Sequence, residues 1–258
     1  INSKRQIIDI VYWAKIFNEE KQKKDKIDVP VIIMAGGFGT RMQPFTHILP
    51  KPLIPINNKP TIEHIMQKFI LQGISRFIVT INHKAHIMKS FFREIKNNYK
   101  LNYIEEKKPL GTAGALKLLE KKISKDFFVI NCDTIINTDF KEIYNFHKKN
   151  KNSITIIASA KEFTIPYGIC KTGKFGKLKS LIEKPKINFL ANSGGYVVKP
   201  NILKIIPRNK KFDFTQLILA AKKNKFKIGV FLVNDNNWLD VGQWSEYKKT
   251  VDLMKNEN

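Results

Sequence analysis

The chain is organised around the run Val31-Ile32-Ile33-Met34-Ala35-Gly36-Gly37-Phe38-Gly39-Thr40-Arg41-Met42. The continuous apolar segment at its start is typical of a parallel strand that is buried on both faces. The glycines that follow let backbone N–H groups approach a phosphate closely. The pattern predicts a phosphate-binding turn at the end of a buried strand, with a plain glycine turn as the alternative.

Two cations next to this turn favour the phosphate-binding interpretation. Arg41 presents a planar fork of N–H donors, which suits phosphate oxygens. Lys51 lies between Pro50 and Pro52, and the fixed backbone angles of the prolines stiffen the loop around it. A plain glycine turn would not need this combination of residues.

Strand and helix patterns alternate on the C-terminal side of this turn. Short apolar runs predict strands, and apolar residues at helical spacing predict helices. The predicted strands cover 31–34, 77–81, 101–104, 127–130, 154–160, 167–170, 178–182, 195–198 and 228–232. The predicted helices cover 62–70, 86–95, 112–121, 140–148, 201–206 and 214–222, with a last one starting near 243. We therefore predict one α/β domain over 29–258, with extra strands in its second half. Residues 1–28 read as an N-terminal extension and linker.

The composition excludes several classes of protein. The 258 residues carry a net charge of +24, but 41 of the 46 basic residues are lysines spread along the whole chain. Because base readout and bidentate phosphate recognition favour arginine, we expect no nucleic-acid partner and a surface that favours small anionic substrates. No apolar run is long enough to span a membrane. Two cysteines form no disulfide framework, so we expect a reducing, cytoplasmic location.

Six further motifs follow the glycine-rich turn in order. They are Pro109-Leu110-Gly111-Thr112-Ala113-Gly114-Ala115, Asn131-Cys132-Asp133, Pro166-Tyr167-Gly168, Ile182-Glu183-Lys184-Pro185, Asn192-Ser193-Gly194-Gly195-Tyr196 and Trp238-Leu239-Asp240-Val241-Gly242. Together with the turn, this order resembles the signature of the sugar-1-phosphate nucleotidylyltransferases over about residues 30–252. The resemblance implies a Rossmann-like fold with a mixed, mainly parallel central sheet flanked by helices. It also implies the reaction of a nucleoside triphosphate with a sugar 1-phosphate to give a nucleotide sugar and pyrophosphate.

The resemblance assigns three cations to catalysis and two carboxylates to a metal ion. Arg41 and Lys51 would hold the triphosphate, and Lys184 would hold the sugar phosphate. The nucleophile is a phosphate oxygen that is already anionic, so no protein base is expected, and charge stabilisation is the main task. Asp133 and Asp240 would bind Mg²⁺, which takes oxygen ligands and completes its shell with water and phosphate oxygens.

Glu106 bears on the choice of base. A carboxylate accepts the adjacent N1–H and N2–H₂ donors of guanine, whereas uracil and thymine offer one N–H between two carbonyls. We therefore expect GTP as the substrate, and a surface charge in a polar run is the alternative for Glu106. The nucleotide-binding residues implied by the resemblance are Ala35, Gly36, Gly37, Gly39, Thr40, Glu106, Pro109, Gly111 and Thr112.

The sugar pocket is predicted from the resemblance alone. Its residues would be Tyr167, Gly168, Glu183, Asn192 and Gly194, with Glu183 and Asn192 bonding hydroxyl groups. The chain also resembles a subgroup in which regulatory CBS domains precede the catalytic domain. That subgroup includes the glucosamine-1-phosphate guanylyltransferases of bacterial legionaminic acid synthesis and flagellin glycosylation. We therefore expect glucosamine 1-phosphate as the second substrate and the end of a CBS module in residues 1–28.

Several alternatives remain open from the sequence. The sugar could be mannose or glucose, with another nucleoside triphosphate. A regulator that binds a nucleotide without turning it over would carry the same loop. A homodimer is compatible with the sequence, but no single stretch identifies its interface.

Overall fold

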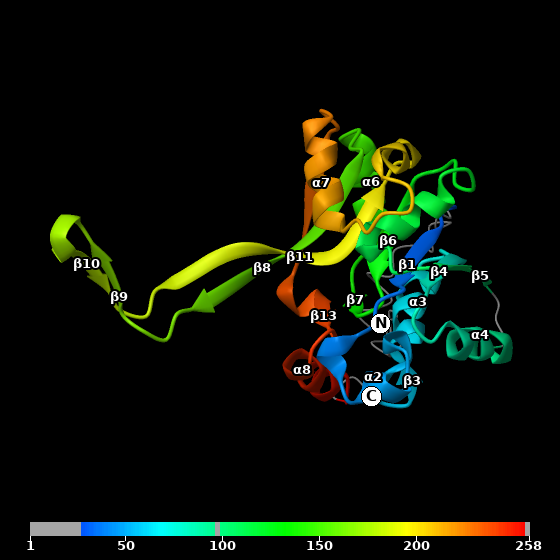
Figure 1. The fold of residues 1–258 in the computed structure, drawn as a ribbon, viewed down its shortest axis with the longest axis horizontal. Helices are drawn as coiled ribbons and strands as arrows, with labels where there is room; N and C mark the ends of the chain where they lie inside the picture. The colour runs from blue at the N-terminus through cyan, green and yellow to red at the C-terminus, as the bar shows by residue number, and fades with distance from the viewer. Residues whose placement is uncertain (1–26, 96–98, 256–258) are drawn as a thin grey trace, which may run out of the picture.

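The computed structural model describes residues 27–95 and 99–255, and its centre is a seven-stranded sheet of order β12-β8-β11-β6-β1-β4-β5 (Figure 1). The strands are β1 (Val31–Ala35), β4 (Arg76–Ile81), β5 (Lys100–Glu105), β6 (Phe127–Asn131), β8 (Ile154–Thr164), β11 (Lys186–Val198) and β12 (Ile228–Val233). Neighbouring strands from β6 to β5 run parallel, and β12 runs parallel to β8. Only β11 runs antiparallel to its neighbours β6 and β8. The predicted mixed, mainly parallel sheet is confirmed.

Helices cover both faces of this sheet. The longer ones are α3 (Thr61–Ile70), α4 (Ala85–Glu94), α6 (Phe140–Lys149), α7 (Phe214–Lys223) and α8 (Trp244–Lys255). Alternate residues of β1 belong to two separate apolar clusters, with Ile33 packed in the cluster of Phe69 and Ile32 in that of Leu217. Because successive side chains of a strand point to opposite faces, this alternation places one helical layer on each side. The expected three-layer α/β architecture is therefore present.

Three small antiparallel sheets extend this framework. They are β2 (Pro55–Ile56) with β3 (Lys59–Pro60), β7 (Thr134–Ile136) with β13 (Trp238–Asp240), and β9 (Ile169–Thr172) with β10 (Leu178–Ile182). The outer parts of β8 and β11 leave the body as a two-stranded ribbon that carries β9 and β10 at its end (Figure 1). We refer to residues 160–190 as the arm.

The structure corrects three of the predicted elements. The predicted helix 112–121 is a short α5 (Gly111–Gly114) followed by the 3₁₀ helix η3 (Ala115–Leu119). The N–H groups of Ala113 and Gly114, in the first turn, donate to the carbonyl of Phe212. The helix predicted at 201–206 is the 3₁₀ helix η5 (Pro200–Ile205), and β11 begins at Lys186 because it pairs with β8 over that length.

Five shorter elements complete the described chain. They are α2 (Phe45–Ile48) and the 3₁₀ helices η1 (Thr40–Met42), η2 (Lys51–Leu53), η4 (Lys174–Gly176) and η6 (Asp235–Asn237). Within 27–95 and 99–255, no helix is long and apolar enough to cross a bilayer. Apart from Ile27 and Asp28, the expected N-terminal extension lies outside the described residues.

Candidate active site

The glycine-rich loop lies at the carboxyl end of β1, where ligands of open α/β sheets collect. Gly39 has a φ of 67°, in the left-handed region that favours glycine. A Cβ built on it would lie 2.8 Å from Cγ2 of Thr46 and 3.0 Å from Cβ of Lys51. The Thr46 hydroxyl donates to the carbonyl of Gly39 over 2.9 Å. The loop is therefore packed directly against Lys51.

Lys51 and Asp133 form an ion pair beside this loop. Their side chains are 11% and 14% exposed, so both charges are largely removed from bulk water. A cavity of about 180 Å³ opens here, between the ends of β6 and β13 and the inner part of β11. Its lining residues are Arg41, Asn131, Asp133, Thr134, Asn192, Ser193, Gly194, Tyr196, Trp238 and Asp240. We call this cavity the phosphate cleft.

The pairing of β7 with β13 brings Asp133 and Asp240 together from distant parts of the chain. A Cβ built on Gly242 would lie 2.6 Å from Oδ2 of Asp133 and 2.8 Å from Oδ1 of Asp240, so the two carboxylates converge. Burial raises the pKa of Asp240, and the charge of Asp133 raises it further. The N–H of Gly242 donates to Oδ1 of Asp240 over 2.7 Å.

Two converging carboxylates fit the donor set that Mg²⁺ uses when substrate phosphates and water complete its shell. The described residues contain no group of three or more histidine, cysteine, aspartate or glutamate side chains placed to hold a metal by themselves. Asp133 and Asp240 are therefore compatible with a metal ion that is bound jointly with substrate, and less suited to a closed structural site.

Glu106 is buried, with 4% of its surface exposed, which excludes its interpretation as a surface charge. Its Oε2 accepts a hydrogen bond from the N–H of Leu110 over 3.0 Å. A Cβ built on Gly36 would overlap Oε1 of Glu106, so any side chain at that position of the loop would displace the carboxylate. Burial raises the pKa of Glu106, while hydrogen bonds from Leu110 and from the Thr80 side chain lower it.

Two polar residues that support Glu106 were not identified from the sequence. The Thr80 hydroxyl accepts a hydrogen bond from the N–H of Ala35 over 3.3 Å, and Asn82 donates to the carbonyl of Glu106 over 2.6 Å. Thr80 lies in the apolar strand β4, where a threonine reads as a strand former. No sequence signal distinguishes it from a packing residue.

The motif that contains Gly111 and Thr112 is hydrogen-bonded to the segment that leads into α7. Gly111 has a φ of 79°, and a Cβ built on it would lie 2.6 Å from Oδ1 of Asp213. The N–H of Thr112 donates to the same oxygen over 3.1 Å, and the Thr112 hydroxyl accepts from the N–H of Phe214. Pro109, the first residue of this motif, is exposed. The motif of Gly111 therefore owes its shape to a segment about a hundred residues later in the chain.

The structure divides the predicted sugar-binding residues between two places. Asn192 and Gly194 line the phosphate cleft, where the Oδ1 of Asn192 accepts from the N–H of Gly194 over 3.1 Å. The others, Tyr167, Gly168 and Glu183, lie on the arm and are exposed, and so is Lys184, which was predicted to be catalytic. A Cβ built on Gly168 would lie 2.9 Å from Oε2 of Glu183, so these two residues of the arm lie next to each other.

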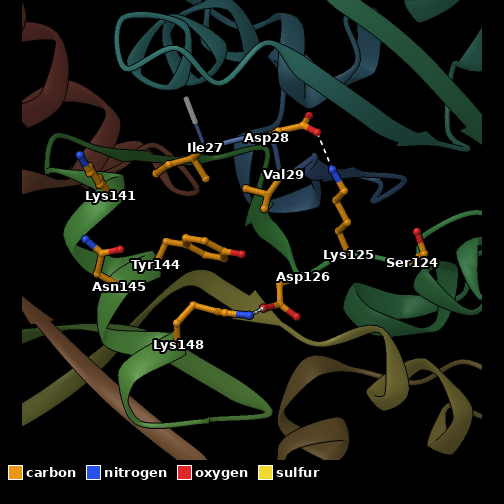
Figure 2. Close-up of a pocket in the computed structure, with 10 residues that line it drawn as sticks. All are labelled: Ile27, Asp28, Val29, Ser124, Lys125, Asp126, Lys141, Tyr144, Asn145 and Lys148. Atoms are coloured by element: carbon orange, nitrogen blue, oxygen red, sulfur yellow. Dashed lines mark hydrogen bonds and ion pairs between the residues drawn. The ribbon is translucent and has the colours of Figure 1, made fainter. Parts of the chain in front are cut away.

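A second cavity, of about 560 Å³, opens at the opposite edge of the sheet (Figure 2). Figure 2 shows Asp28 bonded to Lys125 and Asp126 to Lys148 around it. It lies before the start of β1 and β6, and none of the predicted site residues lines it. The predicted site residues therefore lie away from this cavity.

The nucleotidyl transferase family matches residues 30–257. The chain belongs to this family. A mannose-1-phosphate guanyltransferase of Hypocrea jecorina is 34% identical over 230 residues, which cover 84% of this chain and 61% of that protein. The chain thus spans about three fifths of the length of the curated relatives that it matches.

Solved structures of nucleotidyl transferases share the architecture. HddC of Yersinia pseudotuberculosis is 29% identical with a TM-score of 0.70, covering 88% of this chain and 99% of that one. HddC has also been solved in complex with GMP-PN. A UDP-glucose pyrophosphorylase in complex with UDP-glucose has a TM-score of 0.68, covering 90% and 100% of the two chains. At 19% identity it supports the fold alone.

Proposed function

We propose that the protein transfers GMP from GTP to a sugar 1-phosphate, with release of pyrophosphate. The observation that carries this proposal is the convergence of Arg41, Lys51, Asp133 and Asp240 at one cleft beside the glycine-rich loop. Both reactants are anions, so bringing them together needs cations and a strongly cationic transition-state environment. The cleft supplies the two cations Arg41 and Lys51, while its two carboxylates, Asp133 and Asp240, would be matched by a metal ion.

In the proposed reaction, an oxygen of the sugar 1-phosphate attacks the α-phosphorus of GTP in line with the leaving pyrophosphate. One P–O bond forms, the bond between the α- and β-phosphates breaks, and no proton has to be removed from the nucleophile. Arg41 and Lys51 stabilise the negative charge that builds on the phosphate oxygens. A Mg²⁺ ion held by Asp133 and Asp240 would add Lewis-acid stabilisation of the same charge.

Binding of the metal and of the triphosphate requires a rearrangement at the ion pair. Lys51 now neutralises Asp133. A metal ion beside Asp133 would compete with Lys51 for the carboxylate, and the released ammonium group would be free to contact phosphate. The ion pair therefore keeps the cleft neutral until a metal-bound nucleotide enters.

The choice of guanine rests on Glu106. A buried carboxylate that faces a carbonyl oxygen of uracil or thymine would be left without a donor, which is costly in a low-dielectric site. Guanine supplies two adjacent donors. The mannose-1-phosphate guanyltransferase relatives and the GMP-PN complex of HddC support the same base.

Two sugars are proposed for the acceptor. Glucosamine 1-phosphate follows from the resemblance of the motifs to the CBS-associated subgroup and would place the product in legionaminic acid synthesis. Mannose 1-phosphate is favoured by the names of the relatives at 31–34% identity. Glu183 and Asn192 would bond the sugar hydroxyls in either case.

A substrate panel tests the proposal. Four nucleoside triphosphates are combined with glucosamine, mannose and glucose 1-phosphates, and pyrophosphate release and product mass are measured with Mg²⁺ present. Turnover of GTP with one of the first two sugars is expected. GTP binding without pyrophosphate release would establish a nucleotide-binding regulator instead, and turnover of UTP or dTTP alone would refute the role of Glu106.

A further inference from the structure

The outer end of the β8–β11 ribbon has one mainly apolar face. Lys161 lies opposite Phe189 on that face, and Leu190 lies on the other face. In the ladder between β8 and β11, Phe163 pairs with Ile187, and Phe189 follows on the same face. These three side chains are 46–56% exposed. The opposite face carries Asn188 paired with Glu162, which forms an ion pair with Lys186 over 2.9 Å. An antiparallel ribbon with this alternation normally buries its apolar face.

Exposed apolar side chains are concentrated on this arm. Of the nineteen large apolar side chains that are exposed in the described part of the chain, nine lie between Phe163 and Leu190. With about half of ~200 Å² exposed on each, they offer on the order of 900 Å². A standard protein interface buries about 800 Å² on each partner. The nine side chains lie on both faces of the ribbon and on its tip, so the arm as a whole offers apolar area of that order. An isolated two-stranded ribbon is marginal in water.

The phosphate cleft lacks the residues that the arm carries. Two motifs of the same ordered series lie toward the tip of the arm. They contain Tyr167, Gly168, Glu183 and Lys184. At about 3.4 Å per residue, the ribbon from Asn192 to Lys184 spans on the order of 25 Å. None of these four residues lines the cavity of about 180 Å³ at the cleft.

The ribbon's own hydrogen bonds hold it in an extended course. Its ladder continues without interruption from Asn192 opposite Ala158 to Lys186 opposite Thr164. Figure 1 shows it leading away from the cleft that is formed beside β7 and β13. A second copy related by a two-fold axis could receive the tip with the ladder in its present extended course.

We propose that two copies of the chain exchange arms, and that the arm tip of each copy completes the sugar-phosphate site at the cleft of the other. Lys184 would then supply the sugar-phosphate cation in trans, with Glu183 and Tyr167 beside it. The assignment of Lys184 to the sugar phosphate rests on the proposed function, but the pairing of arms does not.

Complementation between two inactive variants tests the exchange. Asp133→Asn removes a cleft residue, and Lys184→Ala removes an arm residue. The two full-length variants are co-expressed with different affinity tags and purified over both tags. Each mixed dimer then holds one site with an intact cleft and an intact arm, so about half of the wild-type rate is expected. A mixed dimer of Asp133→Asn with Lys51→Met serves as the control and stays inactive, because both lesions affect the cleft.

Two measurements do not depend on catalysis. Phe189→Asp should convert a dimer to a monomer by light scattering, and the neighbouring Asn188→Asp on the opposite face should not. Circular dichroism confirms that both variants are folded. A maleimide–benzophenone crosslinker on the exposed Cys170 of the arm should yield a covalent dimer on a denaturing gel.

The outcomes separate the two proposals. A chain that is monomeric, or one whose copies do not purify together, overturns the arm exchange even if it turns over GTP. A dimer that survives Phe189→Asp and shows no complementation also overturns it. Co-purification, Cys170 crosslinking and loss of the dimer in Phe189→Asp support the exchange even if no nucleotide is turned over, in which case only the proposed function fails.

Discussion

The Nζ of Lys51 forms an ion pair with Oδ2 of Asp133, a residue 82 positions later in the chain. The sequence motifs assign these two residues to different tasks, one to phosphate and the other to metal. The structure shows that each neutralises the other in a largely buried position. The pair therefore links the two halves of the proposed electrostatic machinery.

Lys51→Met should reduce kcat by about 10²- to 10³-fold, because it removes a cation from the transition state. It should also destabilise the fold by about 3 kcal/mol, because it leaves the buried charge of Asp133 unpaired. Steady-state pyrophosphate release and denaturant unfolding measure the two effects. Lys59→Met, at an exposed position, is the control and should change neither. A Lys51→Met variant of normal kcat would refute the role of this cation.

Gly36→Ala and Gly37→Ala form a matched pair on the phosphate-binding loop. A Cβ at position 36 would overlap Oε1 of Glu106, and a Cβ at position 37 would meet nothing within 4 Å. We expect Gly36→Ala to cost about 1–3 kcal/mol of stability from overpacking. Gly37→Ala should stay within about 0.5 kcal/mol of the wild type. Thermal unfolding of both variants provides the comparison, and equal midpoints would contradict the placement of Glu106 beneath the loop.

Glu106→Gln should alter base selection. The amide matches uracil and thymine better than guanine, so kcat/KM for GTP should fall about 10- to 100-fold while UTP or dTTP gains relative to it. Competition between GTP and UTP in one reaction, resolved by product mass, measures the ratio directly. An unchanged preference for GTP would mean that another group reads the base.

The same variant tests the raised pKa of Glu106. As pH rises above the ordinary pKa of a glutamate, the unfolded chain loses the proton before the folded protein does. The free energy of unfolding therefore falls until the pH passes the raised folded pKa. Glu106→Gln lacks this loss, so it should become progressively more stable than the wild type across that range and keep the advantage at neutral pH. Urea unfolding from pH 4 to 8 measures the difference, and a constant difference would show that the pKa is not raised.

Mg²⁺ should stabilise the folded protein if Asp133 and Asp240 bind it. A ligand at 100 times its Kd adds about 2.7 kcal/mol to stability, which a thermal shift detects. Asp240→Asn should abolish most of the Mg²⁺-dependent shift, with GTP present to complete the metal shell. Asp28→Asn, at the opposite edge of the sheet, should retain the full shift. A persistent shift in Asp240→Asn would place the metal elsewhere.

The sequence alone predicted most of the central sheet. Apolar runs such as 31–34 and 127–130 are local patterns. A strand that is buried on both faces needs apolar residues at every position, whatever its place in the sheet. The same reasoning missed β7 and β13, because three-residue strands carry too little periodicity to be recognised. It also shortened β11, whose outer half on the arm alternates apolar and polar residues instead of forming a continuous apolar run.

The chain's sequence determined which chemical groups are available and in what order they occur, since glycine loops, strand ends and ordered motifs depend on neighbouring residues. Only the tertiary structure decided that Asp133 faces Asp240, that Glu106 is buried under Gly36, and that Lys184 lies on an arm outside its own cleft. Those relationships join residues far apart in the chain. They arise from how strands pair and layers pack. No local pattern of side chains predicts which distant segment will lie beside it in the fold.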